Sequence, residues 1–157
     1  MNIELLVFEV AGQQFGIRAQ EVREILRAVT ISPLPGAPPV FEGVINLRGR
    51  VVAVLNLRVL LAATPKALEH TDHLIVVQSD RRILAIRVDR AVHLAQFSDA
   101  QIESSEAIAH TVPFVSDIAR TSDGIVHVLA PSKFLSAAES AALRESFSRS
   151  AAMETAT

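Results

Sequence analysis

The densest group of potentially reactive side chains is the run Glu-His-Thr-Asp-His at residues 69–73. Carboxylates and imidazoles are common ligands of divalent metals, so the four such side chains in this run could form a metal site. No further pair of ligands at metal-binding spacing accompanies them in the sequence. A solvated connection between a loop and a strand is the alternative, and we favour it, so no metal is expected.

Two histidines and one aspartate fall within predicted strands and could take part in proton transfer. His93 and His127 are surrounded by apolar residues, where an imidazole more often packs through a hydrogen bond than moves a proton. Asp89 follows the strand residues 86–88 and could act as a base. A lone carboxylate at a strand end more often accepts backbone N–H groups of the next turn. We therefore assign none of the three to catalysis.

Sequence signatures of catalysis are also missing. The chain has no glycine-rich phosphate loop, no serine nucleophile elbow and no cysteine, which removes thiol catalysis and thiolate metal sites. These absences predict a protein without catalytic residues or cofactors, which acts by binding other proteins.

Composition and charge narrow the class of partner. Of the 157 residues, 50% are hydrophobic and 20% are charged, which suits a packed globular domain. The formal net charge of -2 gives nucleic acid and anionic membranes no general attraction. Trp and Tyr are absent and only two lysines are present, so the stacking side chains and basic stripe of a nucleic-acid-binding barrel are missing. A small barrel that binds nucleic acid is kept as a distant alternative.

The N-terminal residues, the length of the apolar stretches and the lack of cysteine indicate the cellular compartment. The N-terminus enters a strand pattern at Ile3 without a basic leader, and no apolar stretch reaches the roughly 20 residues of a membrane helix. A chain without cysteine also suits a reducing compartment. We expect a cytoplasmic protein.

Alternation of apolar and polar residues, the period of a β-strand, dominates the chain. The predicted strands are 3–10, 14–18, 40–47, 51–57, 74–78, 83–89, 92–95, 114–120 and 125–129. Polar or glycine-containing turns separate several of them, as in antiparallel hairpins. Each group of strands is too small to hold a core alone, so the sequence predicts an all-β (mainly β) fold of two small barrels packed side by side over a shared apolar seam.

Helical segments are predicted at three places. In residues 19–27, Val22, Ile25 and Leu26 fall at i, i+3 and i+4, which predicts a short helix after the first hairpin. Residues 56–61 predict a short helical turn. Near the C-terminus, a Ser and a Glu three residues apart have the spacing of a capping box and predict a helix within 132–150. A stiff connector with four prolines separates the first helix from the next strands.

The residues around the Asn-Leu-Arg-Gly turn at 46–49 could anchor a partner protein. Asn46 and Arg48 are two apart on a predicted strand, so their side chains are expected on one face. Gly49 lets a partner's backbone approach, and an arginine can donate two parallel hydrogen bonds to a carboxylate or a carbonyl. An internal salt bridge of Arg48, with Glu24 or Glu42, is the alternative.

Residues 41–58 resemble the central signature of CheW-like domains, in which Gly-Val-Ile-Asn-Leu-Arg-Gly precedes an apolar strand and Asp-Leu-Arg. Phe8, Gly12, residues 15–17 and the proline-rich connector 33–39 fit the same pattern upstream, and Ile-Arg-Val-Asp at 86–89 resembles a strand end of the family. The sequence departs from the pattern at Asn56 in place of Asp, at Ala53 in place of Pro, and at 130–131. Asparagine caps a helix about as well as aspartate, so the fold should tolerate the first change.

The resemblance implies a single domain over 1–157 built from two SH3-like, five-stranded β-barrels. The first barrel is expected over 14–72 and the second over 73–130, with 1–13 and the C-terminal helix 132–150 packing across them. It also implies a cytoplasmic, non-catalytic adaptor at membrane receptor arrays. This adaptor would couple the cytoplasmic tip of chemoreceptors (methyl-accepting proteins) to the regulatory domain of a CheA-type histidine kinase. No cofactor, metal, nucleic acid or membrane insertion is implied.

The residues that the resemblance places in receptor or partner binding are Val22, Glu24, Gly43, Asn46 and Arg48. For Val22, packing inside the molecule is an equal alternative. For Gly43, a requirement of the backbone and access for a partner are both open. A specialised paralogue that binds only one of the two partners, or that serves another motility or gene-regulation pathway, is the alternative function.

Overall fold

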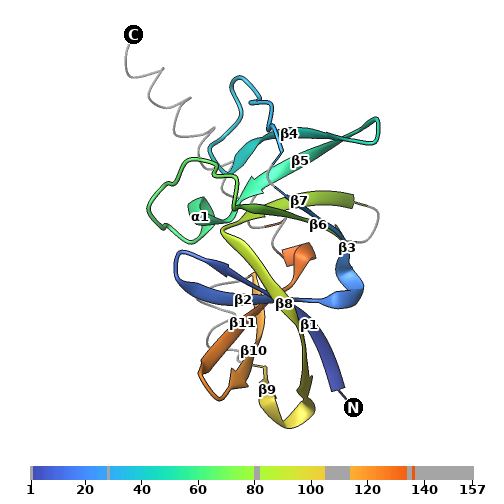
Figure 1. The fold of residues 1–157 in the computed structure, drawn as a ribbon, viewed down its shortest axis with the longest axis vertical. Coiled ribbons are helices and arrows are strands. Elements are labelled where there is room, and N and C mark those ends of the chain that lie inside the picture. The colour runs from blue at the N-terminus through green and yellow to red at the C-terminus, as the bar shows by residue number, and fades with distance from the viewer. Residues whose placement is uncertain (1, 28, 80–81, 105–113, 134–135, 137–157) are drawn as a thin grey trace.

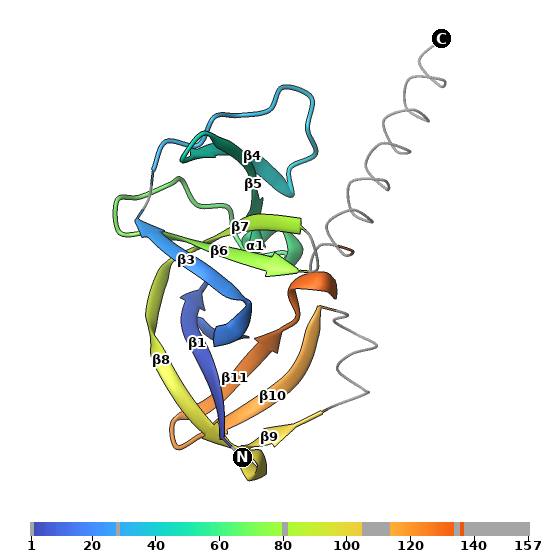
Figure 2. The same cartoon turned by 90° about the vertical axis from the view of Figure 1, so that its right-hand side faces the viewer.

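The computed structural model describes residues 2–27, 29–79, 82–104, 114–133 and 136, and within them the chain is mostly β-strand (Figures 1 and 2). The strands form two sheets, one of six strands and one of five, which lie one above the other along the long axis of the molecule. This arrangement confirms the predicted fold of two small β-barrels. No helix in the described ranges is long and apolar enough to cross a membrane.

The six-stranded sheet has the order β8-β1-β2-β11-β10-β9. Its strands are β1 (Asn2–Val10), β2 (Gln13–Arg18), β8 (Arg90–Ser98), β9 (Ile102–Glu103), β10 (Val115–Thr121) and β11 (Gly124–Leu129). A 3-10 turn, η2 (Asp99–Gln101), connects β8 to β9. The N-terminal hairpin joins the C-terminal hairpin through parallel pairing of β2 with β11. This long-range pairing lies in the middle of the sheet and joins strands from the two ends of the described chain.

The five-stranded sheet has the order β3-β6-β7-β5-β4. Its strands are β3 (Val22–Arg27), β4 (Phe41–Leu47), β5 (Arg50–Asn56), β6 (His73–Ser79) and β7 (Arg82–Val88). The helix α1 (Leu57–Leu60) follows β5, and the Asn56 side chain accepts the Arg58 N–H at 3.1 Å. The predicted helical turn and its asparagine cap are thus confirmed.

The hydrophobic core has three parts, and single strands contribute to two of them by alternation. On β1, Leu5 and Val7 face the interior of the six-stranded sheet, whereas Leu6 and Phe8 face a larger cluster shared by both sheets. This shared cluster also contains Ile75 and other residues of the five-stranded sheet, whose own interior is a third cluster. The predicted apolar seam is confirmed, and it fixes the position of one sheet on the other.

The short helix predicted for residues 19–27 was wrong. Only a 3-10 turn, η1 (Ala19–Glu21), precedes β3, which pairs antiparallel with β6. Val22 and Leu26 are partly buried, but Ile25 is 43% exposed, so burial follows the period of a strand. Residues four apart satisfy both periods, which is why this short segment was ambiguous.

The predicted ranges of the two barrels also differ from the sheets. Strands β6 and β7, within 73–88, belong with β3, β4 and β5, while β2 belongs with β1. The chain passes from one sheet to the other between β2 and β3, and again at Asp89, between β7 and β8. One sheet has six strands in place of the expected five because the short β9 joins it. Most of the predicted C-terminal helix 132–150 lies outside the described residues.

Candidate functional site

Glu24 on β3 and Arg48 in the turn after β4 form a two-pronged ion pair at the surface. Arg48 Nη1 donates to Glu24 Oε2 at 2.8 Å, and Arg48 Nη2 donates to Oε1 at 2.6 Å. The Arg48 side chain is 74% exposed and that of Glu24 is 25% exposed. The hydrogen bond that Arg48 donates to Glu24 raises the pKa of Arg48 further. The pair therefore holds an exposed guanidinium in one orientation while leaving much of it open to solvent.

The turn that carries Arg48 is shaped by the neighbouring asparagine. Asn46 Oδ1 accepts the backbone N–H of Gly49 at 2.8 Å. Arg48 and Gly49 have φ values of 52° and 82°, the left-handed conformation typical of tight two-residue hairpin turns. The expectation that Asn46 and Arg48 lie on one strand face was wrong, because β4 ends at Leu47. The turn redirects Arg48 toward β3.

Gly43 is buried beneath the connector that precedes β4. Ser32 and Val44 exchange two backbone hydrogen bonds of 2.9 Å, which draw the connector over this glycine. A Cβ at position 43 would lie 2.3 Å from the Ser32 carbonyl oxygen. The backbone therefore has its own need for glycine here, independent of any partner.

Val22 lies opposite Val77 on β6 and packs against the shared core cluster. Among the five residues assigned from the sequence, Glu24, Asn46 and Arg48 meet at one surface. Val22 supports the strand that carries Glu24. Gly43 lets the connector at Ser32 pack closely on β4, the strand that leads to this surface.

A depression of about 320 Å³ adjoins the ion pair. It is lined by Arg23, Glu24, Leu47, Arg48, Arg50, Val76 and Ile83. Arg23 and Arg50 have no acidic partner in the part of the chain that the structure describes. The depression thus combines three apolar lining residues with an excess of positive charge, which suits an acidic or carbonyl-rich surface of another protein. Neither arginine was predicted as part of the site, because only the folded sheet brings β3 beside the turn between β4 and β5.

The run at residues 69–73, considered above as a metal site, is instead tied into a network of ion pairs. Asp72 is fully buried and lies 3.1 Å from Lys66 Nζ and 3.3 Å from Arg87 Nη2. Arg87 also pairs with Glu42 and donates to the Lys66 carbonyl at 2.6 Å. The expectation of a solvated connection was therefore wrong for Asp72. Within the described ranges, no group of three or more ligating side chains could hold a metal.

Asp89 joins this network to the other sheet. Its carboxylate lies 2.7 Å from Arg58 Nη2, 3.7 Å from Lys66 Nζ and 2.9 Å from the Ala11 N–H that donates to it. Burial raises the pKa of Asp89, but the Arg58 hydrogen bond, the Ala11 N–H and the two cations outweigh it and keep the pKa below its usual value. Asp89 accepts a backbone N–H, as predicted, although from the β1–β2 turn. It acts as a joint.

The two strand histidines differ in their surroundings. His127 packs against Phe15 with ring centroids 5.6 Å apart, and burial lowers its pKa. His93 is exposed on β8, so its predicted packing role was wrong.

The fold and this surface define a class of protein: a pair of packed β-barrels whose candidate site is an exposed, preoriented charged pair suited to protein contact. The family model of the CheW-like domain matches residues 4–139, and the chain belongs to the CheW-like family. The resemblance seen in the sequence is thereby confirmed.

Relatives and a solved structure agree with this assignment. The chain is 33% identical over 108 residues to the chemotaxis protein CheW of Rhizobium meliloti (strain 1021), covering 68% of each chain. It is 31% identical over 106 residues to a probable chemotaxis protein CheW of Rhizobium etli, again covering 68% of each chain. The crystal structure of the scaffolding protein TtCheW from Thermoanaerobacter tengcongensis superimposes with a TM-score of 0.77 at 25% identity, covering 83% of this chain and 90% of that one.

Proposed function

We propose that the chain is a cytoplasmic, non-catalytic adaptor that couples chemoreceptors to a CheA-type histidine kinase in a bacterial chemosensory array. Its CheW relatives and the likeness to a scaffolding CheW protein support a chemotaxis coupling adaptor. The structural observation that carries the residue-level proposal is the Glu24–Arg48 pair, which presents an exposed guanidinium on a rigid hairpin turn. The receptor tip is the partner proposed for this surface.

Arg48 has donor capacity to spare for a partner. A guanidinium carries five N–H donors, and the two contacts to Glu24 leave the others for a carbonyl or carboxylate of the bound protein. An exposed ion pair contributes little to folding, because water and salt screen it. Holding the side chain in one conformation before binding lowers the entropy that is lost on binding. Recognition is therefore the better explanation of the pair than stability.

The other residues assigned to partner binding have graded roles in this proposal. Asn46 fixes the turn and Glu24 orients the guanidinium. Val22 anchors β3 to the core, and Gly43 acts through the chain path, without direct contact. The flanking Arg23 and Arg50 extend the surface for an acidic partner.

The decisive experiment measures binding of the purified chain to a chemoreceptor signalling tip and, separately, to the regulatory domain of the kinase. Arg48→Asp should weaken binding of the receptor tip by roughly tenfold or more, because the buried interface would then hold like charges. The thermal midpoint should stay close to that of the wild type.

Arg120→Asp is the matched control, because Arg120 is also an exposed, paired arginine, 55% exposed and 3.0 Å from Glu103, but lies in the other sheet. Equal losses in both variants would contradict the proposed site. Binding to neither protein would remove the adaptor assignment, and binding to only one would make the chain a specialised paralogue.

A further inference from the structure

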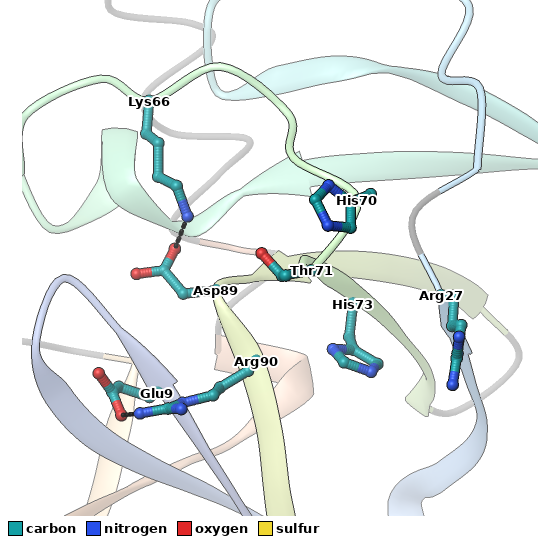
Figure 3. Close-up of a pocket in the computed structure, with 8 residues that line it drawn as sticks. All are labelled: Glu9, Arg27, Lys66, His70, Thr71, His73, Asp89 and Arg90. Carbon is teal, nitrogen blue, oxygen red and sulfur yellow. Dashed lines mark hydrogen bonds and ion pairs between the residues drawn. The ribbon is translucent and has the colours of Figure 1, made fainter.

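A second charged surface lies where the two sheets meet, as Figure 3 shows. This junction pocket has a volume of about 680 Å³ and is lined by Glu9, Arg27, Lys66, His70, Thr71, His73, Asp89 and Arg90. We propose that the junction pocket binds the carboxylate of an acidic side chain presented by a partner protein. The proposal rests on the adaptor role only in taking a protein as the source of the carboxylate.

The pocket is built from two cross-strand pairs, one from each sheet. Arg27 on β3 lies opposite His73 on β6, and Glu9 on β1 lies opposite Arg90 on β8. The loop before β6 closes the space between them with His70 and Thr71 (Figure 3). An occupant would therefore contact both barrels and the loop at once.

The acidic groups of the pocket are already neutralised within the protein. Asp89 is held by Arg58, Lys66 and the Ala11 N–H, and Glu9 accepts from Arg90 Nη2 at 3.2 Å. Arg27 has no acidic partner among the residues described. Arg90 is 67% exposed and uses one nitrogen for Glu9, so donors remain on it. The pocket is thus positive in a chain whose net charge is -2.

Two further side chains, His73 and Thr71, add hydrogen-bond donors to the junction pocket. The His73 ring is partly exposed, and its Nδ1 is buried without a hydrogen-bond partner among the described residues. No described residue therefore fixes the proton on Nδ1, so the ring can carry it on Nε2 and donate from there. The Thr71 hydroxyl adds one more donor at the rim. Arg27, Arg90, His73 and Thr71 thus offer donors to a carboxylate from different sides of the pocket (Figure 3).

The remaining question is which anion the pocket favours. The positive charge of the pocket would attract a phosphate as well as a carboxylate, and the carboxylate is chosen because the partner of an adaptor is a protein. Glu24 and Arg27 are three residues apart on β3, about 10 Å along the strand, and their side chains project to opposite faces of it. The junction pocket and the Glu24–Arg48 pair are therefore separate surfaces.

The test is a titration of the isotope-labelled full chain followed by NMR, with acetyl-tetraglutamate-amide as the probe. The side-chain signals of Arg27 and His73 should shift and saturate, whereas acetyl-tetraglutamine-amide at the same concentration should leave them in place. Arg27→Glu should weaken binding of the tetraglutamate peptide by roughly tenfold, the effect of losing a charge-assisted contact. Arg90→Gln, which keeps most of the side chain, should weaken it by a smaller factor. Arg120→Glu, in the six-stranded sheet away from the pocket, is the control and should bind like the wild type.

Each other result would overturn the proposal. Equal binding of the glutamine peptide would show that binding does not depend on the charge of the peptide. Equal losses of affinity in Arg27→Glu and Arg120→Glu would show a diffuse attraction to the whole surface. Inorganic phosphate that binds as tightly as the peptide would assign the pocket to a free anion. The peptide assay contains no receptor or kinase. Failure of the adaptor proposal would therefore leave the result for the junction pocket unchanged. Conversely, a receptor tip that binds normally while tetraglutamate does not would remove only the junction pocket.

Discussion

Arg58 Nη2 and Asp89 Oδ2 lie 2.7 Å apart, and this pair joins the helix α1 to the point where the chain leaves one sheet for the other. Asp89 also accepts the Ala11 N–H, so a single carboxylate connects three segments distant in sequence. Both side chains are largely buried, with exposures of 14% and 22%. A carboxylate with this many donors holds the two barrels in register more directly than apolar packing does, because each contact is directional.

Asp89→Asn should lower the free energy of unfolding by about 1–2 kcal/mol, because Arg58 and Lys66 lose their shared counter-charge in a partly buried place. Urea denaturation measures the change. Glu103→Gln is the matched control, since Glu103 pairs with Arg120 at 3.0 Å but is 59% exposed. A loss in the control as large as in Asp89→Asn would show that acid-to-amide changes in ion pairs cost the same wherever they lie.

The same residue predicts a dependence of stability on pH. The pKa of Asp89 lies below its usual value of 3.8, so its ionised form stabilises the fold at and above that pH. This contribution is complete above the unfolded pKa and is lost as the pH falls through the folded pKa. The unfolding free energies of the wild type and of Asp89→Asn should therefore differ by a constant amount near neutrality and converge below pH 3.8. Urea titrations from neutral to acidic pH test this, and a constant difference throughout would refute it.

The fold was largely predictable from the sequence because its strands are short and alternate clearly. The helix predicted for residues 19–27 failed because a short segment can satisfy both periods. The predicted barrel ranges failed because pairing between distant strands leaves no local signal. The first barrel was predicted to end at residue 72, yet the structure pairs β5 with β7 in parallel across the segment 62–72. The polar residues of the segment, Lys66 and Asp72, bind it to the sheets.

The candidate site was predictable only in part, for the same reason. The Asn-Leu-Arg-Gly motif identified Arg48, and Glu24 was among the two acids considered as its internal partner. The flanking Arg23 and the junction residues Arg27 and Arg90 were missed, because their meeting depends on which strand edges come together. Surface arginines scattered along a sequence carry no indication of a shared pocket until the sheets are placed.

Gly43→Ala should destabilise the protein more than a turn glycine would. The added Cβ would lie 2.3 Å from the Ser32 oxygen and 2.9 Å from Ile31 Cγ2, so the connector must move and lose its bridge to Val44. We expect a loss of about 2–3 kcal/mol, as for overpacking against a fixed backbone. Gly12→Ala is the control, since Gly12 has φ +77° and nothing within 4 Å of its Cβ position. It should lose roughly 1 kcal/mol from the backbone conformation alone. Equal thermal midpoints for the two variants would contradict the packing explanation.

Exchange of the two charges in the surface pair separates recognition from stability. The double variant Glu24→Arg, Arg48→Glu keeps an ion pair between β3 and the β4–β5 turn but removes the guanidinium from the turn. If a partner reads Arg48, binding of the receptor tip should be lost in the double variant as fully as in Arg48→Glu, while both proteins melt near the wild-type temperature. If the pair serves only to hold the turn against β3, the double variant should recover the binding that the single variant loses, because the pairing has been restored. Measuring tip affinity and melting temperature for the wild type, the two single variants and the double variant gives the coupling between the two positions, with the rest of the surface unchanged.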